Sequence, residues 1–428
     1  MEIIHWSGAL IGLAIAIILI LIKLNPVYAL FTGAIIGGVI GGASLSDTVS
    51  IIIDGTKSVM GAVVRILAAG VLAGILIESG AAERIAETIV EKLGEKKAIL
   101  SLALACFIIT AVGVFITVSI IIVAPIALTV AKKSKLTRPS ILLAMIGGGK
   151  AGNIISPNPN TISVAKGFNV DLAQVMIGGF IPAVLGLIAT YFVATYLKRK
   201  GDMIGENEGV KQEVKDKPSF SRSIVAPIVA IILLGASPLG SILNIGFLER
   251  IKIDSMIILP VAGIIGLAAM GKLNKILEYT ASGLNKMTGT AIILIGAGAI
   301  AGIISNSNLS SVVVELIDKS GISGVLLAPL SGILMAAATA STSTGVIVAS
   351  GSFGDAILSM GIAPLNAAVM MHAGGVVLDQ LPHGNFFLIT ADAVNMDIKD
   401  RLKLIIYEAI VGGVMVITAT ILYGYLKF

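Results

Sequence analysis

The chain has 428 residues, of which 56% are hydrophobic and 13% are charged, and its mean hydropathy is +1.01. A water-soluble domain of this size could not bury so many apolar side chains, so the composition excludes a soluble globular protein and predicts an all-α polytopic membrane protein. The net charge of +5 comes from predicted loops, and it indicates orientation in a membrane rather than nucleic-acid binding.

The first half of the chain, residues 1–197, is predicted to hold five membrane crossings and one hairpin. Two apolar helices come first, and we interpret the earlier one as retained because it lacks the basic flank of a signal peptide. The later elements are a third helix at 62–80, a stretch rich in small residues at 98–131, a segment interrupted by Gly, Pro and Asn at 139–166, and a last helix at 174–197. The stretch at 98–131 is too long for one helix and short for two full crossings, so we expect a re-entrant hairpin.

A polar linker at 198–222 leads into residues 223–428, where the same order of elements recurs. The corresponding elements are a third helix at 288–306, a hairpin at 322–350, an interrupted segment at 364–391 and a last helix at 404–426. A shift of 228 places Gly55 on Gly283, and a shift of 225 places Asn160 on Asn385. An ordered series of such matches indicates duplication.

An odd number of crossings in each half inverts the second copy. We therefore predict two inverted-topology repeats with about ten transmembrane helices, two re-entrant hairpins and two broken helices. The basic segments at 83–97, 132–138 and 198–222 then fall on one side, which the positive-inside rule makes cytoplasmic. The same model places Arg401 among the cytoplasmic flanking charges. We expect a multi-pass protein of the bacterial inner membrane. Its expected partners are the lipid bilayer and a second copy of the chain, in a homodimer.

The interrupted segments contain the polar groups from which a site could be built. Unwound backbone at membrane depth is tolerated only where it is buried in protein or lines a cavity. Two breaks in inverted halves are expected to face one midplane site, where helix N-termini attract an anion. The candidate substrate-binding residues are Thr117, Ser119, Asn153, Ser156, Asn158, Asn160, Thr161, Ser341, Thr342, Ser343, Thr344, His383 and Asn385. Their hydroxyl and amide groups suit a polyhydroxylated or carboxylate ligand.

Lys150 and Asp379 are ionisable residues within the two breaks, where a charge is costly unless it is paired or functional. We hypothesise that Lys150 stands in for a bound cation, and that its ammonium either pairs with Asp379 or attracts the substrate carboxylate. Protonation of Asp379, His372 or His383 could then couple transport to a proton gradient. These residues are the candidate coupling residues.

The chain resembles the gluconate permease (GntP) family of proton symporters, within the wider ion transporter superfamily. The resemblance rests on residues 74–88, the stretch from Phe115 to Pro125, Ser-Pro-Asn-Pro-Asn at 156–160, and the segment 372–387. It implies proton-driven uptake of a sugar acid or hydroxy acid. The chain departs from the family pattern at Thr117 in place of an acidic residue, Asn158 in place of a histidine, and Pro382-His383 in place of Asn-Asp; Lys150 is also unusual in that family.

Three other functions are alternatives for a chain of this composition. A cation/proton antiporter of the same superfamily is the nearest alternative, but the core holds few acidic residues. A channel would need a continuous polar pore. The single cysteine, Cys106, lies in an apolar run, and the three histidines form no His-Glu-x-x-His motif, so we expect no enzyme, no metal site and no cofactor.

Overall fold

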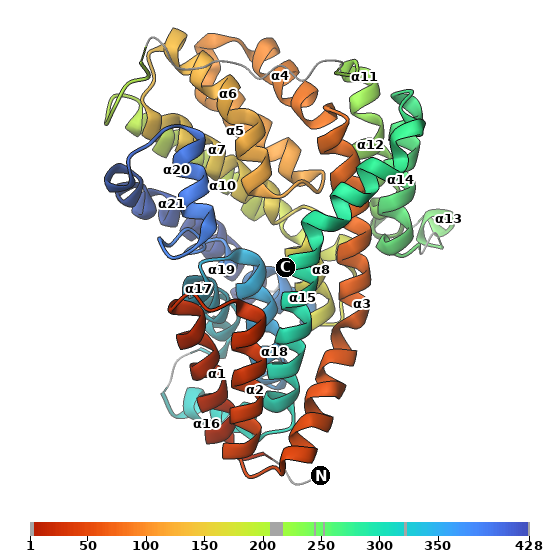
Figure 1. Ribbon diagram of the computed structural model, residues 1–428, viewed down its shortest axis with the longest axis vertical. Coiled ribbons are helices and arrows are strands. Elements are labelled where there is room, and N and C mark those ends of the chain that lie inside the picture. Colours follow the sequence, from red (N-terminus) through yellow and green to blue (C-terminus); the bar gives the residue numbers. More distant parts are fainter. Residues whose placement is uncertain (1–3, 206–216, 244, 251–252, 321–322, 427–428) are drawn as a thin grey trace.

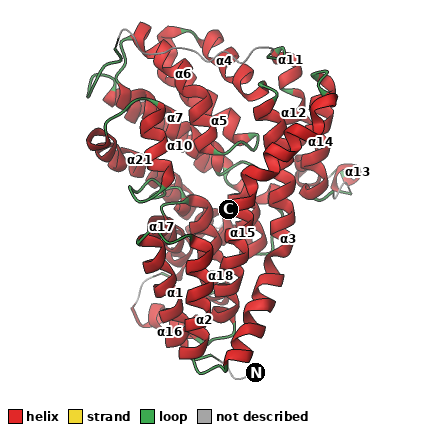
Figure 2. Ribbon diagram, viewed as in Figure 1, coloured by secondary structure: helices red, strands yellow, loops and turns green. Residues whose placement is uncertain are grey.

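The structure is a computed structural model, and it describes residues 4–205, 217–243, 245–250, 253–320 and 323–426. Within these residues it contains helices and no β-strand (Figure 2). The all-α class predicted from composition is therefore confirmed for the part of the chain that the structure describes.

The helices of the first half are α1 (Trp6–Leu21), α2 (Pro26–Ile40), α3 (Leu45–Glu78), α4 (Ala81–Leu93), α5 (Ala98–Ala111), α6 (Ile116–Ser134), α7 (Arg138–Asn153), α8 (Pro159–Gly167), α9 (Leu172–Gly178) and α10 (Phe180–Leu197). Those that follow are α11 (Phe220–Ser223), α12 (Val225–Leu243), α13 (Gly246–Glu249), α14 (Ser255–Ala269), α15 (Ile276–Ser305), α16 (Leu309–Ser320), α17 (Leu327–Thr339), α18 (Thr342–Ser359), α19 (Pro364–Gly375), α20 (Asn385–Ala393) and α21 (Ile398–Ala419). Short 3-10 turns (Glu95–Lys97, Leu273–Lys275, Gly324–Leu326) and a π-helical end (Thr420–Tyr425) complete them. Apart from α9, α11 and α13, the order of long and short helices is similar in the two halves.

Helices α3 and α15 are the longest elements, and they cross at the centre of the molecule (Figure 1). They contain 34 and 30 residues, or about 51 and 45 Å at 1.5 Å per residue, so each begins well before the predicted 62–80 and 288–306. Their contact is made by glycine. A Cβ atom added to Gly55 would lie 2.2 Å from the carbonyl oxygen of Gly298, and one added to Gly283 would lie 2.0 Å from that of Gly70. The small residues allow the two backbones to touch.

Both stretches that were predicted as hairpins form two helices joined by a tight turn. In the first, α5 and α6 are joined at Gly113, whose φ of +109° favours a residue without a Cβ. In the second, α17 and α18 are joined at Ala340, with φ +45°, and Ser341. Each turn therefore brings a helix N-terminus, that of α6 or α18, to the tip of its hairpin.

Six helices in the described residues have at least 18 residues and enough apolar character to cross a membrane: α3, α6, α10, α15, α12 together with α11, and α21 with its π-helical end. Four shorter apolar helices, α1, α2, α14 and α17 with its preceding turn, accompany them. Large apolar side chains are exposed on several of these helices, including Ile18, Tyr28 and Ile232. Exposed apolar surface of this extent is suited to lipid, so the protein is a multi-pass membrane protein.

The last part of the polar linker, from Lys217 onwards, is attached to α4. The ammonium of Lys217 lies 2.7 Å from a carboxylate oxygen of Glu83 and 2.8 Å from one of Glu87, and Arg84 donates to the carbonyl of Pro218. Glu95, which follows α4 in the sequence, pairs with Lys133 at the end of α6 at 3.3 Å. The linker residues 206–216 lie outside the described residues.

Candidate functional site

Two helices are interrupted at corresponding places in the two halves. The first break separates α7 from α8, where Pro157 and Pro159 cannot supply the backbone N–H groups that a continuous helix needs. Asn158 begins α8, because its side-chain oxygen accepts hydrogen bonds from the backbone N–H groups of Asn160 (2.9 Å) and Thr161 (3.2 Å). The second break separates α19 from α20 and spans residues 376–384.

Lys150, in the last turn of α7, connects the first broken helix to the second break. Its ammonium donates to the carbonyl oxygen of Val376 at 2.6 Å, to Asp379 Oδ1 at 2.7 Å and to Gln380 Oε1 at 2.7 Å. Because an ammonium has three N–H groups, all of its donors are used. The side chain of Lys150 is 0% exposed and that of Asp379 is 4% exposed, so the ion pair is buried.

The tip of the second hairpin lies between the two breaks. Thr342, the first residue of α18, donates its hydroxyl to Asp379 Oδ2 at 2.5 Å, and the adjacent Ser343 donates to Asn160 Oδ1 at 2.5 Å. Ser341 caps α18 by accepting from the backbone N–H of Thr344 at 3.2 Å. The hydroxyl run of this hairpin therefore contacts both broken helices.

An asparagine cluster occupies the first break. Asn153 Oδ1 accepts from the side-chain amides of Asn158 and Asn160, the latter at 2.9 Å. The amide nitrogen of Asn153 and the hydroxyl of Ser156 are buried and have no hydrogen-bond partner in the structure. Since buried polar groups are nearly always satisfied, these two groups of the first break have hydrogen-bonding capacity left for a ligand.

The helix ends give the site an uneven charge distribution. The N-termini of α8 and α18 meet at the contact between Asn160 and Ser343, and both carry the positive end of a helix dipole. The C-termini of α7 and α19 meet at Lys150, whose ammonium binds the carbonyl of Val376, the C-cap of α19. The first pair of helix ends suits an anion, and the second is compensated by the lysine.

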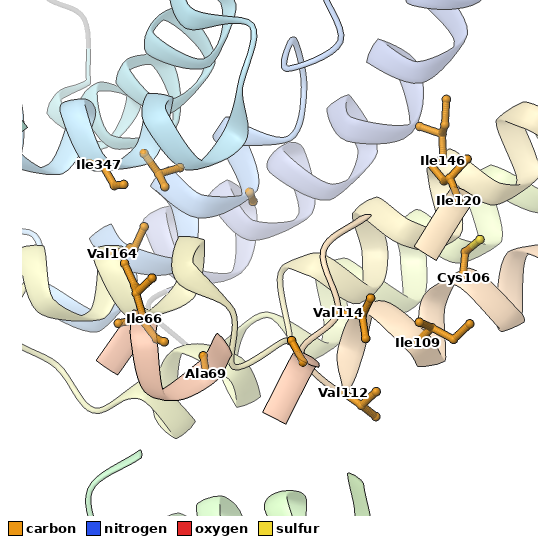
Figure 3. Packing of buried hydrophobic residues seen from close by; sticks show 14 of the residues in the cluster. Ile66, Ala69, Cys106, Ile109, Val112, Val114, Ile120, Ile146, Val164 and Ile347 are labelled. Carbon is orange, nitrogen blue, oxygen red and sulfur yellow. The ribbon is translucent and has the colours of Figure 1, made fainter. Parts of the chain in front are cut away.

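Apolar packing fixes the helices that carry these groups. Val164 of α8 and Ile347 of α18 lie close together, and Ile66 of α3 lies beside Val164 (Figure 3). All three are buried. Helices α8 and α18 are therefore held together by apolar packing, and α8 also packs against α3.

Several predicted site residues are not joined to this cluster by a hydrogen bond. Ser119 accepts from Thr110 within the first hairpin at 3.0 Å, and Thr117 is half-buried at the start of α6. His383 lies 3.3 Å from the carbonyl of Ala338, and Asn385 is exposed at the start of α20. His372 is buried, and neither ring nitrogen has a hydrogen-bond partner. The roles assigned to these residues stay predictions.

A second buried ion pair was missed. Arg401 was predicted among the cytoplasmic flanking charges, but it is 0% exposed on α21, and its guanidinium binds both carboxylate oxygens of Glu408, also 0% exposed. It also donates to Thr390 at 3.2 Å and lies 4.8 Å from the ring centre of Phe387. The side of the membrane on which Arg401 lies stays a prediction, but the burial of Arg401 was missed because every Lys and Arg at the start of the last helix was treated alike. Opposite charges seven residues apart share one helix face, and this spacing was the available signal.

A model of the GntP family of permeases matches residues 4–425. The chain belongs to the GntP permease family. An uncharacterized transporter of Haemophilus influenzae is 52% identical over 421 residues, with 98% of each chain covered. Among more distant relatives, a high-affinity gluconate transporter of Escherichia coli is 23% identical, with 97% of this chain and 99% of the relative covered. The resemblance predicted from the sequence is confirmed.

Two solved structures share the fold of this GntP permease. The YdaH transporter of Alcanivorax borkumensis has a TM-score of 0.67 and 13% identity, over 90% of this chain and 91% of that one. MtrF of Neisseria gonorrhoeae, described as one of a class of antimetabolite efflux pumps, has a TM-score of 0.64 and 14% identity, over 96% and 95%. The chain thus belongs to a family of permeases, and it shares its fold with these two solved structures.

Proposed function

We propose that the protein is a secondary active transporter that imports a small organic anion, a gluconate-like sugar acid or hydroxy acid, together with protons across the bacterial inner membrane. Relatives named gluconate permeases and gluconate transporters support this substrate class. The buried ion pair of Lys150 and Asp379, placed beside two helix N-termini, is the observation that carries the proposal.

The ion pair provides a mechanism for coupling. When Asp379 takes up a proton, it no longer balances the charge of Lys150, and a substrate carboxylate can take its place on the ammonium. When the proton leaves, the pair of Lys150 and Asp379 forms again and displaces the anion. A monoanion that enters with one proton leaves the net charge of the site unchanged, so neither step strands an uncompensated charge in a low-dielectric interior.

The substrate hydroxyls are assigned to the groups that surround the pair. The amide of Asn153 and the hydroxyl of Ser156 have unused hydrogen-bonding capacity, and Asn158, Asn160 and Ser343 lie next to them. Amides and hydroxyls can donate and accept, which suits a polyhydroxylated chain. Binding would thus place the substrate carboxylate between the ammonium of Lys150 and the N-terminus of α18, whose Thr342 contacts Asp379, and the substrate hydroxyls on the asparagine cluster.

We further propose that residues 1–197 and 223–428 are inverted repeats joined by a cytoplasmic linker at 198–222. The similar order of helices in the two halves supports this arrangement. In it, the hairpins α5–α6 and α17–α18 are re-entrant, ten helices cross the membrane, and alternating access moves the two broken helices relative to the rest of the protein.

Uptake of labelled gluconate into proteoliposomes tests the function. With an imposed pH gradient, alkaline inside, we expect accumulation above the external concentration and loss of accumulation when a protonophore is added. Passive equilibration of gluconate would contradict the proposal. Movement of labelled sodium in response to the pH gradient, without gluconate uptake, would instead indicate the cation/proton antiporter.

A further inference from the structure

We propose that the ammonium of Lys150 fills a preformed site for a monovalent cation, and that shortening this side chain opens the site to sodium. The proposed function supplies the role of this site in transport. The site itself can be tested in the absence of any organic anion.

The oxygen atoms around Lys150 resemble the ligands of a hard cation. A backbone carbonyl (Val376), a carboxylate (Asp379) and an amide oxygen (Gln380) converge on the ammonium at 2.6 to 2.7 Å. Carboxylates and carbonyls are the donors that hard cations prefer. Unwound carbonyls at the C-terminal ends of half-helices are also the groups that coordinate coupling ions in transporters with broken helices.

These three ligands are positioned by contacts that do not involve Lys150. Asp379 is held through its other oxygen by the hydroxyl of Thr342. Gln380 is held through its amide nitrogen, which donates to the carbonyls of Val377 (3.0 Å) and Ile405 (3.2 Å). Gly412 of α21 packs directly on the carbonyl of Val376. Removal of the lysine side chain therefore leaves the oxygen atoms in place.

The charges of the buried core favour a cation at this position. Arg138, which is also buried, lies at the opposite end of α7 from Lys150, where it donates to the carbonyl of Val394 at 2.7 Å. Of the other buried charged side chains, Lys150 balances Asp379 and Arg401 balances Glu408, so these four charges sum to zero. Without the lysine the sum is −1, and the unpaired carboxylate is buried in a region with little solvent. Such a group must gain a cation or a proton. In the native chain the tethered ammonium satisfies it, so no sodium is needed.

The test compares thermal unfolding of the purified full-length Lys150→Ala variant in sodium chloride and in choline chloride of equal ionic strength. We expect sodium to raise the Tm of this variant by about 3 °C or more, because a ligand that binds only the folded state stabilises it. The wild-type protein, whose site is filled, should show no difference between the two salts.

Two matched variants separate site binding from a general salt effect. Lys150→Met fills the same space with an uncharged side chain, and Lys150→Ala combined with Asp379→Asn removes the charged ligand. Neither should respond to sodium. An equal response of the Met variant, or the same Tm for folded Lys150→Ala in both salts, would overturn the proposal.

One further variant and one further salt complete the test. Lys150→Ser supplies a replacement oxygen, and failure of both the Ala and the Ser variants to fold in sodium would count against the site. Stabilisation of Lys150→Ala by ammonium chloride but not by sodium chloride would overturn sodium as the occupant. Because gluconate is absent throughout, a negative result here leaves the transport proposal standing, and failed gluconate uptake by the wild type leaves this result unaffected.

Discussion

The two buried ion pairs differ in what they join. Lys150 and Asp379 are 229 residues apart and connect a helix of one half to the break of the other. Arg401 and Glu408 are seven residues apart on α21, so their bond lies within one helix. A pair between separate elements can part when those elements move, whereas a pair within a helix moves as a unit. The first pair is therefore suited to a switch and the second to holding the fold.

The largest expected effect tests the second pair. Arg401→Leu leaves Glu408 buried without a partner, which should lower the free energy of unfolding by about 3–5 kcal/mol. Removing both charges, with Leu at each position, should restore most of this loss, because no charge remains to be compensated. Thermal unfolding and the yield of monodisperse protein measure both variants. A double variant as unstable as the single one would contradict the structural role.

Asp379→Asn tests the first pair as a switch. The amide resembles a permanently protonated carboxyl, so proton-driven accumulation of gluconate should fall by about 100-fold, equivalent to about 2.7 kcal/mol. Exchange of internal for external gluconate requires no net proton movement, and it should continue. A variant that has lost both processes while remaining folded would show that Asp379 is needed for binding rather than coupling.

A smaller effect is expected at the contact between α18 and α8. Ser343→Ala removes the hydrogen bond to Asn160, which is worth about 1 kcal/mol. The concentration of gluconate that gives half-maximal uptake should rise by about fivefold. Ser311→Ala, on the exposed face of α16, serves as the matched control and should leave uptake unchanged.

The smallest effect, on the free energy of unfolding, is expected for a partly exposed ion pair. The Arg65 guanidinium, 3.0 Å from Asp254, holds the pKa of that carboxyl below its ordinary value. The ion pair contributes to the free energy of unfolding only when Asp254 is ionised, so the contribution is complete at neutral pH. It is lost as the pH falls from the unfolded-state pKa of about 3.9 through the lower pKa of the folded state. Asp254→Asn should cost less than about 1 kcal/mol at pH 7, since the pair is partly exposed. Thermal unfolding at neutral and acid pH measures this; a difference that persisted in acid would exclude the ion pair as its cause.

The sequence predicted the breaks, and it gave the pairing of Lys150 with Asp379 as one of two alternatives, because proline, asparagine and buried charge each have few explanations in a membrane segment. It placed the start of α3 too late. The charges of Asp54 and Lys57 interrupt the apolar pattern of the sequence, so the helix was predicted to begin after them. In the structure the two side chains pair with each other on the exposed face of one continuous helix. It also missed the burial of Arg401, since the apolar environment of that residue is created by distant helices. Local pattern identified the elements, and only tertiary packing decided which charges were buried.

The glycine crossing of α3 and α15 limits how the protein can move. Where two backbones touch without side chains between them, sliding by a fraction of a helical turn brings a carbonyl oxygen into a Cα atom, and no flexible group can absorb the collision. The two helices therefore cannot slide past each other at this crossing. In the proposed transport cycle, α3 and α15 would keep their relative position, and the hairpins with their broken helices would rotate on either side of them.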